Sequence, residues 1–323
     1  MGNRSFIVKA AVSISSIDAM ISGMPRSRVY LPKVASPPST ILEHLTSQFP
    51  HIPAATWKDR MVRGLVTTST GEVLNETSPY SHGLMVFYIK EVPSEPPCAE
   101  LESIVFQDDE ILVADKPHGM PVTPAGNHVA RSLVNRLQER TGIGNLAPLH
   151  RLDRDTAGLV LFCIKPEVRG RYHQLFAHGT IQREYLAVAT LKGTPGDRHW
   201  IVKNHLASGE PWFRRRIVEN ETPNAITAIE LIETGNGLGL FHLVPRTGKK
   251  HQLRVHMSSI GYPILGDPLY PELRNPEANL PLQLLAAALA FVDPLTGAQR
   301  EFKSSLRLRF SENVTESTMD NSR

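Results

Sequence analysis

The stretch from residue 149 to residue 162, LHRLDRDTAGLVLF, constrains the fold of this chain more than any other. Five charged or titratable side chains within six positions, 150–155, are followed by Thr and Ala, then a glycine and a run of large apolar residues. Apolar runs that a turn signal bounds are typical of buried strands. A strand over residues 158–164 would hold the polar cluster at its entrance, with Asp153 near a surface that a ligand can reach. The alternative is a surface turn with Arg–Asp ion pairs, each of which contributes little to the stability of the fold.

The composition is that of an ordinary globular protein. The 323 residues suffice for about two domains, and 41% of them are hydrophobic and 21% charged. The net charge is only +3, so a nucleic-acid site would have to be a local patch. Cys98 and Cys163 match no metal or redox spacing, which predicts reduced thiols. No run approaches ~18 apolar residues and the start lacks a signal-peptide pattern, so we expect a cytoplasmic protein without membrane contact.

Residues 36–90 have the pattern of a small α+β domain, after an extension over residues 1–35 that shows no clear pattern. Ser39 or Thr40 can cap a helix that Pro50 ends, and a small hairpin is expected over residues 65–74. Two short helices and a β-rich tail resemble the α-L RNA-binding motif that precedes several RNA-modifying enzymes. The alternative is a generic cap with solvated basic residues. The second helix, over residues 54–63, is expected to turn apolar side chains inward and basic ones outward: Trp57, Met61 and Val62 against Lys58, Arg60 and Arg63.

Residues 101–310 are expected to form the main domain. The proline-rich residues 91–100 predict a linker before it, and the polar residues 311–323 predict a disordered tail after it. Within the main domain the patterns predict elements in this order: strands at 103–106 and 111–114, a helix at 129–140 ended by Gly142, a strand at 158–164, a helix at 166–176, a strand at 181–189, a looser excursion at 190–225, paired strands at 227–233 and 238–244, a helix at 282–290 and a strand near 301–309.

A second polar cluster, residues 245–256, carries four Lys or Arg and two His but no acidic residue. Thr247 and Gly248 can cap a helix that begins near His251 and ends at Gly261. Backbone amides at such a helix start, with cations beside them, can bind phosphates. The alternative is a solvated basic helix start with no ligand. A metal site is not expected, because His251 and His256 are five residues apart and no zincin-type Glu accompanies them.

Four stretches in order resemble the ribosomal large-subunit pseudouridine synthase A family, over about residues 101–310. The first is residues 150–159, H-R-L-D-x-x-T-x-G-L. Residues 115–119 resemble the family's D-K-P-x-G loop, and residues 183–185 resemble its K-x-Y strand. Residues 247–256 and 261–267 resemble its T-G-R-T-H-Q-I-R-x-H … G-x-P-I-x-G-D block. One such motif is weak, but four in the expected order are highly specific.

The resemblance implies an α+β fold, with a mixed, mostly antiparallel sheet, flanking helices and a small N-terminal domain. It implies an RNA pseudouridine synthase that isomerises a uridine in structured ribosomal or transfer RNA. No metal, nucleotide or redox cofactor and no obligatory protein partner are implied. Asp153 would be the catalytic carboxylate, and Arg151 would pair with it and lower its pKa. Tyr185 would stack on the target uracil and Arg254 would be a second cation. The implied substrate contacts are His150, Lys249, Lys250, His251, Gln252 and Leu253.

The chemistry suits these residue types. Moving uracil from a nitrogen to a carbon glycosidic link requires a bond to break, the base to rotate and a bond to form at carbon 5. A carboxylate can act as nucleophile or as base in such steps, and the sequence leaves both open. The target base must also leave its stack, which is cheapest in loops and bulges of RNA.

The chain departs from the family at several positions. Ala157 stands where Ser is usual, Lys249 and Lys250 stand for Arg-Thr, and Arg183 stands for Lys. Two family histidines are missing near residues 284–294. The four candidate catalytic residues are retained, so the departures bear on the substrate more than on the activity.

Two alternatives are open at this point. A catalytically inactive RNA-binding or RNA-chaperone protein could use the same scaffold. The paired acids Asp153 and Asp155 are also similar to those of haloacid-dehalogenase-type phosphotransferases. That motif requires Thr or Val at the position of Ala157, and it places the apolar strand before the acids, whereas here the strand follows them.

Overall fold

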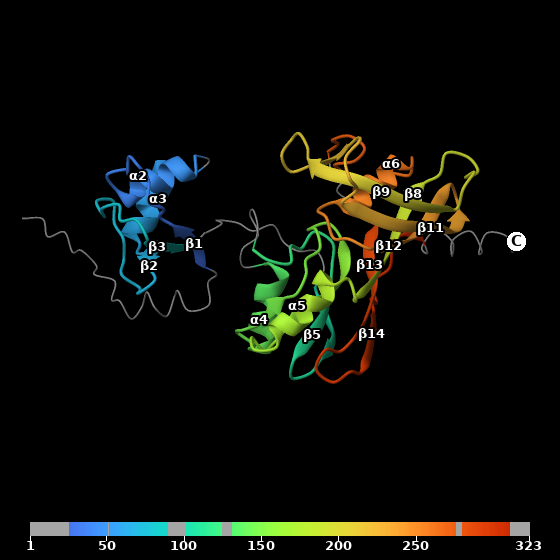
Figure 1. Ribbon diagram of the computed structural model, residues 1–323, viewed down its shortest axis with the longest axis horizontal. Helices are drawn as coiled ribbons and strands as arrows, with labels where there is room; N and C mark the ends of the chain where they lie inside the picture. The colour runs from blue at the N-terminus through green and yellow to red at the C-terminus, as the bar shows by residue number, and fades with distance from the viewer. Residues whose placement is uncertain (1–25, 51, 90–100, 125–130, 276–279, 311–323) are drawn as a thin grey trace, which may run out of the picture. The chain divides into compact units, whose positions relative to one another are not determined.

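The computed structural model describes residues 26–50, 52–89, 101–124, 131–275 and 280–310, in two compact units, Met1–Ser94 and Glu95–Arg323 (Figure 1). The expected linker at 91–100, the expected tail at 311–323 and most of the 1–35 extension lie outside these residues. No helix in the described ranges is long and apolar enough to span a membrane.

The first unit is a three-stranded antiparallel sheet with two helices. Its strands are β1 (Arg26–Tyr30), β2 (Val66–Thr68) and β3 (Met85–Ile89), in the order β1-β3-β2. Helix α2 (Ile41–Gln48) begins where the Thr40 hydroxyl accepts the Glu43 amide, as its cap position predicts. The expected hairpin over 65–74 is present in a short form: Thr67 bridges to Val73, and the amides of Thr68 and Leu74 donate to the carbonyls of Glu72 and Val66, each at 2.8 Å. The other edge of β2 pairs with β3.

Helix α3 (Ala54–Val62) corrects two expectations about burial. Val62 is exposed and Arg60 is buried, the reverse of what the residue types suggest. Residues three and four positions after Trp57 share its face of the helix, which turns Arg60 and Met61 into the core and Val62 away from it. The Arg60 guanidinium is accommodated there because it lies 5.1 Å from the centre of the Trp57 ring.

The second unit is built on one large mixed sheet, which confirms the expected fold class. Its strand order is β10-β9-β11-β12-β8-β13-β7-β5-β4, with β14 beside β13 and β6 beside β7. Among the described strands of this sheet, every pair is antiparallel except β7–β13. The strands are β4 (Ser103–Gln107), β5 (Ile111–Lys116), β6 (Ala147–Pro148), β7 (Ala157–Cys163), β8 (Gln182–Thr190), β9 (His199–Ser208), β10 (Arg215–Val218), β11 (Ala225–Gly235), β12 (Leu238–Pro245), β13 (Leu284–Val292) and β14 (Gln299–Lys303).

Helices cover both faces of the β5–β7 part of this sheet. Alternate side chains of β5 and β7 pack in one cluster with α4 (Leu133–Thr141), and the intervening ones pack in another with α5 (Arg169–Ala177). Helix α4 ends at Gly142, as expected, in the left-handed conformation with φ 73°. Helix α6 (Gln252–Ser259) contributes Leu253 and Met257 to the cluster that contains α4. Figure 1 shows α4 and α5 near β5, and α6 near β9.

Two expectations about secondary structure are wrong. Residues 190–225 contain β9 and β10 rather than a loose excursion. The apolar run at 282–290, expected as a helix, is the central strand β13. Strand β13 pairs with β8 along one edge, and with β7 and β14 along the other, so tertiary pairing overrides the helix preference of its Ala and Leu residues. The final strand, β14, also begins and ends earlier than the expected 301–309.

Candidate active site

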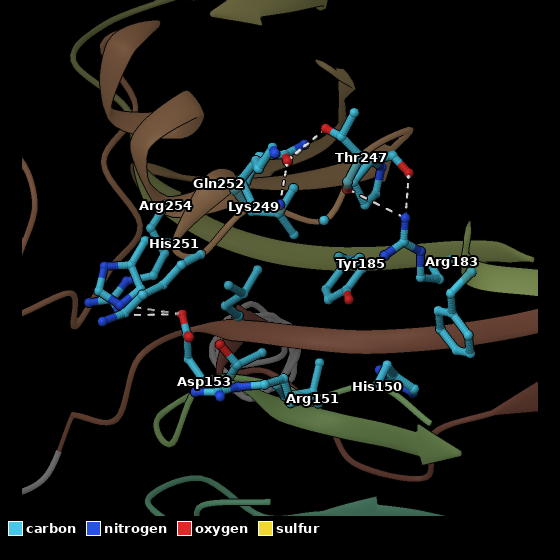
Figure 2. Close-up of a pocket in the computed structure, with 18 of the residues that line it drawn as sticks. His150, Arg151, Asp153, Arg183, Tyr185, Thr247, Lys249, His251, Gln252 and Arg254 are labelled. Atoms are coloured by element: carbon cyan, nitrogen blue, oxygen red, sulfur yellow. Dashed lines mark hydrogen bonds and ion pairs between the residues drawn. The ribbon is translucent and has the colours of Figure 1, made fainter. Parts of the chain in front are cut away.

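A cavity of about 700 Å³ opens where β7, β8 and the start of α6 meet (Figure 2). Its lining comes from residues 149–156, the end of α5, β8 and residues 245–254. All the site residues expected from the sequence line it: Asp153, Arg151, Tyr185, Arg254, His150, Leu253, Lys249, Lys250, His251 and Gln252. The fold therefore brings together residues that are up to about one hundred positions apart in the chain.

The loop that carries Asp153 is fixed by hydrogen bonds to its backbone. The Asp153 carbonyl accepts the Thr156 amide at 3.2 Å, which closes a turn just before β7. The buried Lys116 donates to the Arg154 carbonyl at 2.9 Å and also to the carbonyls of Pro117 and Met120. Such backbone bonds hold the carboxylate of a surface loop in one place.

The carboxylate of Asp153 faces the buried Arg254. Their closest atoms, Oδ2 and Nη1, are 3.8 Å apart, and the Asp153 side chain keeps 25% of its surface exposed to the cavity. Burial raises the pKa of Asp153, and the charges of Arg254 and Lys250 oppose that rise. Figure 2 shows the carboxylate directed toward the side chains of Arg254 and His251.

The close ion pair of Asp153 is with Arg254 rather than with the expected Arg151, and the net shift of the Asp153 pKa is upward although Arg151 lowers it, as expected. Arg151 is exposed, and no ion pair of the described residues joins it to Asp153. Arg151 lowers the pKa of Asp153 less than Arg254 does, and the net shift is upward because burial dominates. The close cation comes from α6, about one hundred residues further along the chain.

Arg254 is held in place by Asp267, the last residue of the motif over 261–267, whose role the sequence pattern does not predict. Its Nε donates to Oδ2 of Asp267 at 2.8 Å, and its Nη2 donates to Oδ1. Both side chains are almost completely buried. A bidentate pair of this kind fixes the guanidinium plane. The remaining Nη1 is the atom that approaches Asp153.

His251 approaches Asp153 as a neutral side chain. Burial, followed by the charges of Arg254 and Lys250, lowers its pKa to about 3, so its 3.7 Å approach to Asp153 is not a salt bridge at neutral pH. Its Nδ1 lies 2.9 Å from the hydroxyl of Tyr270, which accepts the Arg215 amide at 2.7 Å. When that hydroxyl donates to Nδ1, the imidazole proton is on Nε2 and faces Asp153. Sequence reasoning missed Tyr270, although it lies three residues after the matched block.

Tyr185 and Leu253 supply apolar surface to the cavity. Tyr185 lies on β8, opposite Leu243 on β12 and Ala286 on β13, and is 8% exposed. Burial raises the pKa of its phenol, which therefore stays neutral at physiological pH. Leu253 is 7% exposed and belongs to the same hydrophobic cluster. A planar aromatic wall beside a carboxylate can position a flat heterocycle against an acid or base.

The start of α6 differs from the expected Thr247–Gly248 cap. The cap residue is His251, in the left-handed conformation with φ 57°. Gln252 holds the preceding loop instead: its Oε1 accepts the Thr247 hydroxyl at 2.7 Å and the Lys249 amide at 3.0 Å, and its Nε2 donates to Thr227 and to the Ile226 carbonyl. Both polar atoms of the Gln252 side chain are thus hydrogen-bonded, which holds this part of the cavity wall in place.

The remaining expected contacts divide into a partly buried residue and two exposed ones. The Nε2 of His150 accepts the Leu161 amide at 3.0 Å, its ring stacks on Phe176, and burial lowers its pKa to about 3. Lys249 and Lys250 are exposed at the rim. In the described lining, six Lys or Arg side chains accompany the single carboxylate of Asp153, which favours a polyanionic ligand. The described residues contain no group of three or more His, Cys, Asp or Glu that could hold a metal ion.

An enzyme that handles a base of a polyanion fits this combination of aromatic wall, carboxylate and surrounding cations. Comparison with known proteins identifies the family of enzymes. Residues 110–259 match the RNA pseudouridylate synthase family. The ribosomal large subunit pseudouridine synthase D of Zymomonas mobilis is 31% identical over 272 residues, covering 77% of this chain and 84% of that protein. The tRNA pseudouridine synthase C of Vibrio parahaemolyticus is 31% identical over 229 residues, covering 64% and 91%. The chain belongs to the RNA pseudouridine synthase family.

Solved structures agree on the fold. Human RNA pseudouridylate synthase domain containing 1 superposes with a TM-score of 0.53 at 20% identity, covering 70% of this chain and 98% of that one. Human RNA pseudouridylate synthase domain containing 4 gives a TM-score of 0.51 at 23% identity, covering 66% and 91%. The sequence comparisons make the protein an RNA pseudouridine synthase, an isomerase that acts on RNA.

Proposed function

We propose that Asp153 is the catalytic carboxylate of this enzyme and that its substrate is one uridine in structured ribosomal or transfer RNA. The observation that carries the assignment is the position of Asp153, the sole carboxylate in the described lining of a cationic cavity, 3.8 Å from Arg254. In this role Asp153 acts as nucleophile or base while uracil is detached, turned and rejoined through carbon 5.

The size of the cavity favours the binding of a single nucleotide over that of a duplex. A volume of about 700 Å³ is in the range of small-molecule sites, so the target uridine must leave its helix to enter. Tyr185 stacks on the uracil and Leu253 closes its apolar side, which offsets the few kcal/mol that unstacking costs. The neutral phenol of Tyr185 suits stacking on an uncharged base.

The positively charged side chains have two roles, one in binding RNA and one in stabilising the ionised carboxylate. Lys249 and Lys250 at the rim bind phosphates on either side of the flipped nucleotide, and each neutralised phosphate steepens the salt dependence of binding. Arg254, buried and fixed by Asp267, stabilises the ionised form of Asp153. Arg151 is exposed and lowers the pKa of Asp153 less than Arg254 does, so its main contribution is to RNA binding.

The substrate class follows the similar enzymes, whose names assign them to ribosomal and to transfer RNA. Mapping pseudouridines in both RNAs, from cells with and without the gene, tests the proposal and identifies the uridine. We expect one or a few sites to disappear in the deletion strain and to return with the wild-type gene but not with Asp153→Asn. A full set of sites in the deletion strain would contradict the proposal and favour a non-catalytic RNA-binding role.

We further propose that the enzyme works alone, in the cytoplasm. Purified protein should then modify protein-free transcripts of its substrate without an added fraction. A requirement for a cell extract would show that a partner is needed.

A further inference from the structure

The turn between β9 and β10 presents an indole to solvent. Trp212 is 80% exposed, whereas Trp57 is completely buried and Trp200 packs on Phe241 and Tyr262. Removing so large an apolar surface from water is worth several kcal/mol, so an exposed Trp can contribute strongly to binding where its surroundings suit a ligand.

This turn is held in one shape. The Gly209 amide donates to the Arg214 carbonyl at 3.1 Å, and the Arg214 amide donates to Pro211 at 2.8 Å. The Arg214 guanidinium donates to the Pro271 carbonyl at 2.7 Å and lies 5.1 Å from the ring centre of Tyr270. Tyr270 is the residue whose hydroxyl contacts His251 in the cavity. The turn is thus attached to the wall of the active site, so Trp212 needs little reordering when it binds.

The same turn lies at the rim of the cavity. The Nζ of Lys250, a lining residue, is 5.9 Å from the centre of the Trp212 ring. Three consecutive arginines, at positions 214–216, follow Trp212 and Phe213, and Glu210 is the one acidic residue among positions 208–218. An exposed aromatic plane among cations is the combination that binds unpaired bases, because the ring stacks and the cations contact phosphates.

We propose that Trp212 is a stacking platform for the base of a nucleotide next to the target uridine in unpaired RNA. The proposal rests on the proposed function, since it takes the cavity as the place where the flipped uridine binds. The lining of the adjacent cavity favours RNA over a protein partner, because its described residues include six Lys or Arg side chains and one carboxylate, which suits a polyanion. The platform gives affinity without reading sequence, since every base has a π-face.

Tryptophan fluorescence tests the contact directly. The probes are an oligouridylate of about twelve nucleotides and an abasic oligomer of equal length and charge. The protein is the full chain carrying Asp153→Asn, which prevents turnover, and the Trp212 signal is its spectrum minus that of the same protein with Trp212→Phe. We expect oligouridylate to quench this signal and the abasic oligomer to leave it unchanged. Quenching by both, or by neither, would contradict stacking.

Affinity variants give a second readout. Trp212→Ala should weaken oligouridylate binding about tenfold and leave abasic binding unchanged, while Trp212→Phe should retain most of the affinity. The slope of affinity against salt should not change, because no phosphate contact is lost. Ile201→Ala is the matched control: Ile201 is 71% exposed and lies on β9, about 20 Å along the strand from the turn, and its loss should have no effect. Equal losses in Trp212→Ala and Ile201→Ala, or equal losses for both oligomers, would overturn the proposal.

These outcomes are separate from those for the proposed function. If Asp153→Asn protein is catalytically active while Trp212 is quenched, the assignment of Asp153 fails and the platform stands. If Trp212 is not quenched while Asp153→Asn is inactive, the platform fails and Asp153 stands. Trp212 would then be exposed for another class of partner.

Discussion

At the scale of single residues, two opposing effects determine the pKa of the Asp153 carboxyl group. Burial raises the pKa of Asp153, and the nearby charges of Arg254 and Lys250 lower it, with burial prevailing. A nucleophile or base must be ionised, so activity should fall as the pH falls through this raised pKa. The acid limb of the kcat/KM profile should therefore lie above the ordinary range of an aspartate.

Lys250→Gln tests this balance. Loss of the Lys250 charge removes one of the influences that lower the pKa of Asp153, so that pKa rises further and the acid limb moves to higher pH. The measurement is the shape of the kcat/KM profile rather than its height, since weaker RNA binding scales the whole profile. The shift should shrink at high salt. Lys303→Gln, which removes an exposed lysine paired with Glu301, is the control and should leave the limb in place. A limb that moves downward in Lys250→Gln would contradict the assignment.

The residue types in the cavity were predictable from the sequence, but their pairing was not. The motifs identified Asp153, Tyr185 and Arg254, because each stands at a fixed place in a short pattern. Arg151 was the expected partner because it is close in sequence, while the contact that forms is with Arg254, which the fold brings from α6. The roles of Asp267 and Tyr270 depend on three-dimensional contacts that no local spacing encodes.

At the scale of elements, the site depends on the close approach of β7 and β13. Gly158, with φ 111°, lies beside Ala286, and a Cβ atom at this position would come within 2.6 Å of the Ala286 backbone nitrogen and 2.8 Å of its carbonyl carbon. A side chain is therefore excluded both by its conformation and by the neighbouring backbone. Because Gly158 has no side chain, the start of β7, which follows the Asp153 loop, can pack directly against the central strand β13.

Gly158→Ala should consequently destabilise the main unit by at least about 3 kcal/mol. Urea denaturation followed by circular dichroism measures this, as a lower midpoint or as failure to accumulate folded protein. Gly170→Ala is the matched control, because Gly170 lies in α5 with no atom within 4 Å of an added Cβ. Alanine there should be neutral or stabilising by up to about 1 kcal/mol. Similar stabilities for Gly158→Ala and the wild type would show that the sheet can open at this point.

The pattern of residues predicted most elements but failed at β13, for a physical reason. Its apolar positions carry no alternation, because both faces of a central strand are covered, and its Ala and Leu residues favour a helix locally. In β9 the alternation is broken because the exposed position 201 holds an isoleucine and the partly buried position 204 holds an asparagine. Amphipathic elements with a cap or a terminal glycine, such as α2 and α4, were located within a few residues.

At the scale of the whole molecule, each of the two units has hydrophobic clusters of its own among the described residues. One cluster contains Trp57 and the residues around it in the first unit, and others fill the large sheet of the second. A small unit buries less surface than a large one, so it should be less stable and unfold with a smaller m-value. Whether the first unit binds RNA, as its resemblance to the α-L motif suggests, stays a prediction.

Equilibrium unfolding in urea should accordingly show two transitions. The first should change the fluorescence of Trp57, and the second that of Trp200, which packs on Phe241 and Tyr262. Curves for Trp57→Phe and Trp200→Phe separate the two signals. A single transition at one midpoint for both tryptophans would show instead that the units unfold as one.

The central claim is that the carboxylate of Asp153 carries the reaction. The most direct measurement uses RNA with tritium at carbon 5 of its uridines, because the new glycosidic bond replaces that hydrogen and releases it. Under single-turnover conditions Asp153→Asn should bind the RNA and release tritium at least about a thousandfold more slowly than the wild type. Asp155→Asn, which alters the neighbouring acid paired with Arg154, should stay within about tenfold of the wild type. Release by Asp153→Asn at a rate near that of Asp155→Asn would contradict the account.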